Sequence, residues 1–285
     1  MPELPEVEHV VRSLRRAVLG RTIVAAEIHL PKLVAPTSRS AFDRRVKSSR
    51  IQAVSRRGKF ILIELEKLDD AGGKTSQVLV VHLRMTGKFL LLTPDDALPK
   101  HAHAVFYLDD ERRLVFNDQR QFGVMRLVAA SRVTQTKGIE QLAPEPFSED
   151  FSVDYLKQTL ARSRRTLKTL LLDQTRILGL GNIYASEALF RAGINPFVVA
   201  SELSSRRVPR LHQGIRDVLR AAISGNSSRR LNLERPEGFS YGEAFGKVWQ
   251  VYDREGKPCY RCGTPIRRLT HAARSTYWCP KCQRR

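Results

Sequence analysis

The sequence has no long hydrophobic run and few acidic residues, and its N-terminus does not resemble a leader segment. No apolar stretch approaches the roughly 20 residues that a membrane-spanning helix needs. The first residues are acidic, whereas a signal peptide begins basic and then becomes apolar. These absences exclude a membrane span and favour a cytosolic protein.

The shortage of acids gives the chain a strong positive charge. Lysine and arginine number 49 against 29 acidic residues, so the formal net charge is +20 and the pI is about 10.4. A surplus of this size is typical of proteins that bind a polyanion. Nucleic acid is the first expectation, and an anionic membrane surface is the second.

The 285 residues favour two domains, and the pattern of apolar residues changes along the chain. Residues 5–19 predict an amphipathic helix, with apolar positions at helical spacing and arginines late in the segment. Short β-rich runs separated by turn signals follow, with no regular helix expected between them. The predicted strands cover residues 23–30, 51–54, 60–65, 78–83, 89–92, 104–108, 114–117 and 124–128. This succession indicates a β-sandwich or barrel.

The second half of the chain has a helical pattern. Residues 131–150, with two prolines, predict a linker. Helices are then expected over residues 154–173, 182–192 and 205–224, and a long loop without a strong pattern over 225–247.

All four cysteines fall in the last 27 residues, as two C-x2-C pairs separated by 16 residues. In a reducing compartment this clustering points to metal binding, with a redox pair or a chance arrangement as the alternatives. Four thiolates complete a tetrahedral zinc shell, so a zinc ribbon with one structural Zn²⁺ is expected. The predicted ligands are Cys259, Cys262, Cys279 and Cys282. The basic residues around them suit phosphate binding, although a solvated basic tail would have the same composition.

The first residues could carry covalent chemistry. Removal of Met1 would leave Pro2 with a free secondary amine, and an α-amino group has a pKa near 7.7–8.0, far below that of a lysine side chain. Glu3 beside it could donate or take a proton. An amine next to a carboxyl group is a minimal set for Schiff-base chemistry. The alternative is that proline and glutamate simply open a helix.

Motifs from end to end of the chain resemble the formamidopyrimidine-DNA glycosylases, a family of bacterial-type base-excision repair enzymes related to endonuclease VIII. They are Pro2-Glu3-Leu4-Pro5-Glu6-Val7-Glu8, Arg56-Arg57-Gly58-Lys59-Phe60, His82-Leu83-Arg84-Met85-Thr86-Gly87, Lys100-His101-Ala102-His103, Asp118-Gln119-Arg120-Gln121-Phe122-Gly123, Gly179-Leu180-Gly181-Asn182-Ile183-Tyr184-Ala185-Ser186-Glu187, His271-Ala272-Ala273-Arg274 and the cysteine pairs. The resemblance implies an α+β fold: an N-terminal β-sandwich flanked by helices, then a helix–two-turn–helix domain with a C-terminal zinc ribbon.

The resemblance also implies an activity: a bifunctional glycosylase and lyase that removes 8-oxoguanine and formamidopyrimidines from duplex DNA. In that family the Pro2 nitrogen attacks deoxyribose C1′, and the resulting Schiff base permits β,δ-elimination of both flanking phosphates. Glu3 would assist sugar opening or base departure as the acid. Lys59 matches the lysine associated with β-elimination, and Arg274 matches a zinc-hairpin arginine with a part in δ-elimination. We expect Arg274 mainly to hold phosphates, because arginine stays charged.

Work on a duplex base requires the nucleotide to be flipped out and the gap to be filled. By resemblance, Arg120 pairs with the orphaned base, Phe122 wedges into the stack and Met85 fills the gap. From periodicity alone, core packing is the alternative for Met85 and Phe122. The remaining expected DNA contacts are His101, Arg164, Lys168 and Asn182.

The DNA contacts expected of Arg164, Lys168 and Asn182 follow from their positions on predicted helices. Arg164 and Lys168 are expected one turn apart on one helix, where they would extend a phosphate track or form a solvated basic face. The glycines before Asn182 should let DNA approach the helix start, whose free N–H groups attract phosphate.

The resemblance implies domains at 1–130, 151–224 and 251–285, a linker at 131–150 and a lesion-recognition loop at 225–250. A monomer associated with the bacterial nucleoid is expected. Two segments depart from the family pattern: the turn 118–121 and the loop that begins Gly225-Asn226-Ser227-Ser228. Two alternatives therefore remain: an endonuclease VIII-like enzyme for oxidised pyrimidines, and a catalytically silent zinc-ribbon protein that binds nucleic acid.

Overall fold

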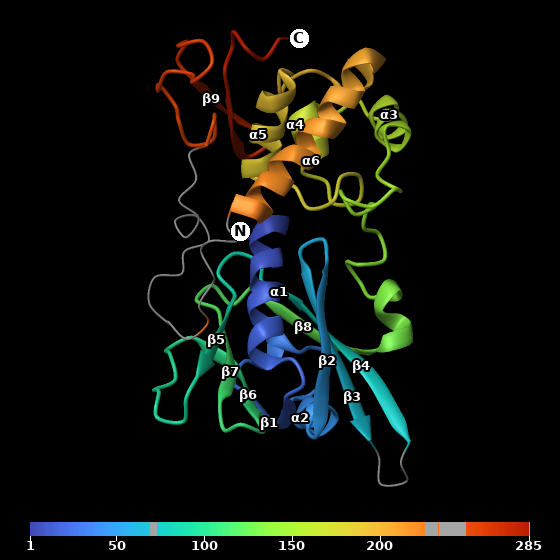
Figure 1. Cartoon of the computed structure of the whole chain (residues 1–285), viewed down its shortest axis with the longest axis vertical. Coiled ribbons are helices and arrows are strands. Elements are labelled where there is room, and N and C mark those ends of the chain that lie inside the picture. Colours follow the sequence, from blue (N-terminus) through green and yellow to red (C-terminus); the bar gives the residue numbers. More distant parts are fainter. Residues whose placement is uncertain (69–72, 226–232, 234–248, 285) are drawn as a thin grey trace. The chain divides into compact units, whose positions relative to one another are not determined.

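The computed structural model describes residues 1–68, 73–225, 233 and 249–284 (Figure 1). Contacts divide the chain into two compact units. The first unit comprises Met1–Pro2, Glu6–Glu140 and Asn226–Phe245, and the second comprises Glu3–Pro5, Gln141–Gly225 and Gly246–Arg285. The lesion-recognition loop expected at 225–250 lies largely outside the described residues.

The first unit is built on an antiparallel sheet of eight strands in the order β5-β7-β6-β1-β2-β3-β4-β8. The strands are β1 Thr22–Ile28, β2 Ser49–Arg57, β3 Phe60–Leu68, β4 Lys74–His82, β5 Lys88–Leu92, β6 Ala102–Leu108, β7 Arg113–Asn117 and β8 Val124–Ala129. All eight strands expected from the sequence are confirmed.

Both ends of the sheet contribute to one hydrophobic core, as in a two-layered sandwich. Phe89, Phe106 and Phe116 come from the β5-β7-β6 end, and Ile61 and Val81 from the other. The link between the two ends is short, because β1 and β2 share only two paired positions. The expected β-sandwich is therefore confirmed.

Helix α1 (Leu4–Val18) covers this core (Figure 1). Its apolar positions recur at helical spacing, so they form one stripe that is buried along its length. These residues are Val7, Val10, Val11, Leu14 and Val18. The amphipathic helix expected at 5–19 is confirmed.

The expectation that no regular helix lies among the strands is wrong. Helix α2 (Arg39–Val46) connects β1 and β2, and Ser38 caps it by accepting a hydrogen bond from the Ala41 N–H at 3.3 Å. The helix has only two buried apolar residues, Phe42 and Val46, spaced by four. Two positions are too few to establish a helical period in the sequence.

The second unit contains helices α3 (Val153–Ala161), α4 (Leu167–Leu171), α5 (Asn182–Ala192) and α6 (Val208–Gly225). The expected single helix at 154–173 is wrong, because it divides into α3 and α4. Thr166 starts the second piece as its N-cap, in extended backbone. The helix expected at 182–192 is confirmed, and the one at 205–224 begins with a 3₁₀ turn, Ser205–Arg207, that leads into α6.

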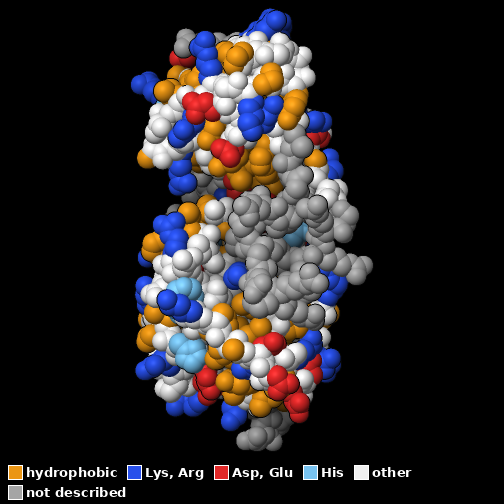
Figure 2. All heavy atoms as spheres, turned by 90° about the vertical axis from the view of Figure 1, so that its left-hand side faces the viewer, with side chains coloured by type: hydrophobic (Ala, Val, Ile, Leu, Met, Phe, Trp, Pro, Cys, Tyr) orange, Lys and Arg blue, Asp and Glu red, His pale blue; other side chains and the backbone are white. Residues whose placement is uncertain are grey.

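The zinc-ribbon segment ends the second unit with a hairpin of β9 (Arg267–His271) and β10 (Arg274–Trp278). Short 3₁₀ turns occur at Pro31–Leu33, Ala130–Gln135 and Ala200–Glu202. Among the described residues, no helix combines the length and apolar character needed to cross a membrane. Lysine and arginine side chains are spread over the face drawn in Figure 2, as the +20 charge leads one to expect.

Candidate active site and zinc centre

Glu3 is buried at the start of helix α5. Its carboxylate accepts hydrogen bonds from the backbone N–H groups of Gly181 at 2.5 Å, Ile183 at 2.9 Å and Tyr184 at 3.2 Å. The first N–H groups of a helix have no partner within the helix, and the helix dipole favours negative charge there. The fold therefore holds this carboxylate in a fixed place.

Two glycines make room for the N-terminal segment. A Cβ atom on Gly181 would overlap the Glu3 carboxyl, and one on Gly179 would overlap the Leu4 side chain. Gly179 has φ +88°, and its carbonyl accepts the Leu4 N–H at 3.1 Å. The expectation that these helix-start N–H groups bind phosphate is wrong for the three that bind Glu3, because an internal carboxylate takes them.

Pro2 and Lys59 belong to the first unit, and both are buried. Lys59 follows Gly58, whose φ of +57° makes the turn between β2 and β3, so the expected position before a strand is confirmed. Lys59 also contributes to the lowered pKa of His82. Burial, followed by the positive charges of Arg84 and Lys59, lowers the pKa of His82 to about 3, which keeps its ring neutral.

Met85, Arg120 and Phe122 lie on exposed loops of the first unit. The side chains of Met85 and Phe122 are 39% and 51% exposed, although both are large and apolar. The Arg120 guanidinium lies 4.9 Å from the centre of the Phe122 ring. Core packing, the alternative from periodicity, is therefore excluded for both apolar residues.

Thr86 and Asp118 join the two loops that carry these three side chains. The Thr86 hydroxyl donates to one oxygen of Asp118 and accepts the Arg120 N–H at 3.0 Å. The second Asp118 oxygen accepts the Gly123 N–H at 2.7 Å. Neither residue is predicted as a functional candidate from the sequence, although each is a small polar residue inside one of the family motifs.

Replacing Thr86 by Val should separate the two loops. The substitution leaves a buried Asp118 oxygen and the Arg120 N–H without their partner, so we expect binding of a lesion-bearing duplex to weaken about tenfold. The measurement is a fluorescence titration with lesion and undamaged duplexes. Thr86→Ser keeps the hydroxyl and should bind like the original protein. Equal binding by Thr86→Val would contradict this role.

The other residues expected to contact DNA differ in how far they are exposed. His101 is half-buried, and its carbonyl accepts the Asp118 N–H at 3.0 Å. Arg164 is exposed in the turn between α3 and α4, so the expectation that it shares a helix with Lys168 is wrong. Lys168 is 1% exposed, and the Asn182 side-chain amide donates to the carbonyl of Ser275 at 2.9 Å.

Arg274 is exposed at the turn of the β9–β10 hairpin. Ala272 and Ala273 form the turn with φ +47° and +58°, the left-handed backbone of a tight two-residue hairpin. His271 anchors the hairpin to α4 through its Nε2 atom, 2.8 Å from the Thr166 hydroxyl. Because Asn182 binds the neighbour of Arg274, the hairpin turn and the start of α5 are connected within one unit.

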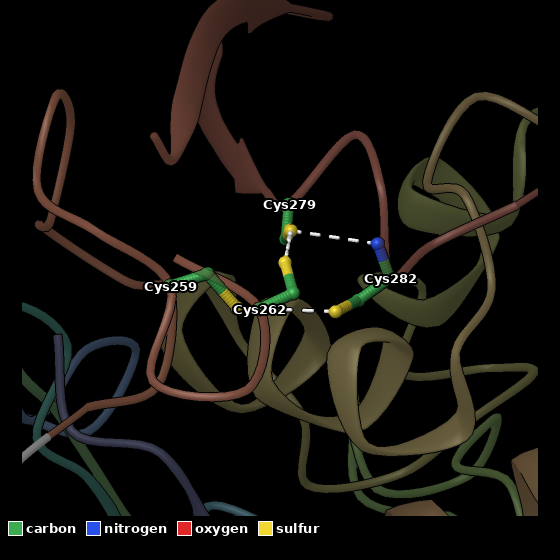
Figure 3. A group of neighbouring side chains, drawn as sticks. All are labelled: Cys259, Cys262, Cys279 and Cys282. Carbon is green, nitrogen blue, oxygen red and sulfur yellow. Dashed lines mark hydrogen bonds between the residues drawn. The ribbon is translucent and has the colours of Figure 1, made fainter. Parts of the chain in front are cut away.

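The four cysteines converge at the other end of the ribbon (Figure 3). All four sulfur atoms lie within 4.8 Å of one another; Sγ of Cys259 is 3.9 Å from Cys282, and Sγ of Cys262 is 3.5 Å from Cys279. Four sulfurs bound tetrahedrally to zinc at about 2.3 Å would lie about 3.8 Å apart. The donors fit one structural zinc, as expected, and leave no open position for chemistry.

Removal of the zinc should unfold the ribbon. Without the metal the four sulfur atoms lose the bonds that hold them together, and metal binding supplies much of the folding energy of such modules. With chelator we expect loss of ribbon structure by circular dichroism and at least about tenfold weaker DNA binding, since the ribbon carries many cations. Restoring zinc should restore binding. DNA affinity that survives complete zinc loss would contradict this expectation.

Comparison with known proteins covers nearly the whole chain. Three family models match: "Formamidopyrimidine-DNA glycosylase N-terminal domain" at residues 1–125, "Formamidopyrimidine-DNA glycosylase H2TH domain" at 142–232 and "Zinc finger found in FPG and IleRS" at 256–285. The formamidopyrimidine-DNA glycosylase of Pelotomaculum thermopropionicum is 41% identical over 284 residues, which is 100% of this chain and 99% of the relative. The chain belongs to the formamidopyrimidine-DNA glycosylase family.

Other members of this glycosylase family agree in sequence and in fold. The Bacillus subtilis enzyme is 39% identical over 99% of both chains. The Fpg of Lactococcus lactis, solved in complex with abasic-site DNA, has a TM-score of 0.86 and 32% identity over 99% of this chain and 100% of that one. MutM in complex with DNA containing carbocyclic 8-oxo-G has a TM-score of 0.85 and 33% identity over the full length of both.

Proposed function

We propose that this glycosylase removes oxidised purines from duplex DNA and then cleaves the strand as a lyase. The proposal rests mainly on the buried Glu3 carboxylate, which the first N–H groups of α5 hold in place. Glu3 directly follows Pro2, the residue whose nitrogen would attack. Solved relatives are complexes with 8-oxo-G, Fapy-dG or abasic-site DNA, which supports the same substrate class here. The basic charge supports a DNA partner.

The reaction begins at Pro2. Its nitrogen lone pair forms a bond to C1′ of the damaged nucleotide, and the base leaves with the electron pair of the glycosidic bond. Glu3 lies beside the nucleophile in the chain, where its carboxyl group can take the amine proton and return it to the opening sugar. The product is an iminium at C1′.

The iminium then drives strand cleavage. It draws electrons from the neighbouring sugar C–H bond, so that proton is lost and the 3′ phosphate departs; a second elimination releases the 5′ phosphate. Lys59 assists the first elimination, and Arg274 holds phosphate during the second. Arg120 pairs with the orphaned base, Phe122 wedges into the stack and Met85 fills the gap left by the flipped nucleotide. The enzyme works as a monomer on the bacterial chromosome.

Borohydride trapping on a panel of duplexes tests the proposal. The panel carries 8-oxoguanine, a formamidopyrimidine, an oxidised pyrimidine or an abasic site, and an undamaged duplex is the control. We expect a reduced covalent adduct on the purine lesions and the abasic site, located at Pro2 by mass spectrometry. Preference for the oxidised pyrimidine would favour the endonuclease VIII-like alternative. Binding without any adduct would favour the silent DNA-binding alternative.

A further inference from the structure

Lys168 is a buried cation beneath the start of helix α5. Its side chain is 1% exposed, and its ammonium group donates to the Asn182 carbonyl at 2.7 Å and to the Ser186 hydroxyl at 2.5 Å. The Ser186 hydroxyl itself donates to the Asn182 carbonyl at 2.9 Å. A lysine is rarely so buried unless it is paired, so these contacts need a reason.

Two buried carboxylates lie in the field of this ammonium group. Glu3 binds the first N–H groups of α5, and Glu187 projects from the same helix. The two Glu187 oxygens accept the N–H groups of Gln250, Val251 and Tyr252, each at 2.9 Å. Glu187 thus ties α5 to the segment that leads into the zinc ribbon. The positive charge of Lys168 interacts with both acids.

The electrostatics of Lys168 follow from this position. Burial lowers its pKa to about 7, the negative charges of Glu3 and Glu187 oppose that shift, and the positive charge of Arg274 adds to it. Each named group acts on the lysine from a different place: Glu3 before α1, Glu187 on α5 and Arg274 on β10. The ammonium group is directed at protein atoms, whereas a phosphate ligand would be exposed to solvent.

We propose that Lys168 is a positioning residue for Glu3, and not a DNA phosphate ligand. It holds the first carbonyl of α5 and places a positive charge near the carboxylate that the same helix start binds. Lys168 therefore fixes the place of the Glu3 carboxylate during base release. This inference rests on the proposed function, because it assigns a partner to the Glu3 of that reaction.

Replacement of Lys168 by Met distinguishes a role in positioning Glu3 from a role in binding DNA phosphate. Met keeps the apolar stem and removes the charge, so we expect single-turnover base release to fall about 100-fold because the catalytic carboxyl is misplaced. The duplex Kd should stay within about twofold, and the slope of log K against log salt should not change. A lost phosphate contact would instead reduce that slope by about 0.9. Arg164→Gln, at an exposed arginine of the same basic segment, should reduce the slope in that way.

The pH profile gives a second readout. As pH rises through about 7, the folded protein loses the Lys168 proton, so the positive charge near Glu3 is present below that pH and absent above it. The Pro2 amine titrates in the opposite sense for activity, because its nucleophilic form increases with pH. The original protein and Lys168→Met have the same Pro2 amine, so its titration cancels in the ratio of their rates of base release. That ratio, original protein to Lys168→Met, should fall as pH rises from 6 to 8.

Controls distinguish this inference from a simple loss of folding. Lys157→Met changes an exposed lysine on α3 and should alter neither base release nor the pH profile. If Lys168→Met does not fold, as judged by circular dichroism, Ser186→Ala decides: it keeps the charge and removes one partner. We expect Ser186→Ala to slow base release about fivefold at unchanged Kd and salt slope.

Any one of three results for Lys168→Met would overturn the assignment: a reduced salt slope, base release equal to that of the original protein, or a ratio of base release that does not vary with pH. Unchanged base release in Ser186→Ala would also overturn it. Failure of the proposed function itself looks different. In that case the original protein would release no base from any lesion duplex, which would remove both proposals together.

Discussion

A form of the protein that keeps Met1 is expected to bind lesion duplex normally and to release no base. With Met1 in place, the Pro2 nitrogen is part of a peptide bond, and its lone pair is delocalised into the carbonyl group. It can no longer attack C1′. We expect base release to fall on the order of 1,000-fold or more, the scale seen when a covalent nucleophile is lost.

The measurement compares two preparations of one sequence, with and without Met1, each verified by mass spectrometry. Met1 is 46% exposed, so its presence leaves the packed residues around it largely as they are. Duplex Kd serves as the control for folding. Pro2→Gly with a free terminus should also lose most activity, because glycine lacks the ring that fixes the amine. Full base release by the preparation that retains Met1 would refute the assignment of Pro2.

The sequence predicts the sheet well because its signal is local. Alternating apolar residues between turn signals mark each of the eight strands, and the structure pairs all of them. Where the signal is short or interrupted, the prediction fails. Helix α2 has two apolar positions, and the segment 154–173 gives no sign of its break except the capping residue Thr166 and the neighbouring Ser163.

The candidate site depends on contacts that no local pattern contains. The Glu3 carboxylate binds the N–H group of Gly181, 178 residues along the chain. Both segments are conspicuous as motifs, yet neither predicts that one carboxylate would take the N–H groups expected to bind phosphate. In the same way, the basic composition around Lys168 predicts a solvated side chain. Its burial follows from the packing of α4 against α5, which periodicity does not reveal.

Replacement of Gly181 by Ala is expected to abolish most base release while leaving the zinc ribbon folded. The new methyl group would occupy the space of the Glu3 carboxyl, so that side chain must leave its three N–H partners. The displacement moves the Glu3 carboxyl away from the N–H groups at the start of α5. A misplacement of about 1 Å can cost about 100-fold in rate, and that is the size of the effect we expect.

Gly20→Ala provides the matched control for Gly181→Ala. Gly20 has φ +78°, so the substitution strains the backbone, yet its Cβ would meet nothing closer than the Arg50 side chain at 3.7 Å. We expect Gly20→Ala to lower the free energy of unfolding by about 1 kcal/mol and to leave base release unchanged. Single-turnover base release and duplex Kd, measured for both variants, separate lost stability from lost geometry. If Gly181→Ala released base as fast as Gly20→Ala, the hydrogen bonds between Glu3 and the start of α5 would have no part in the reaction.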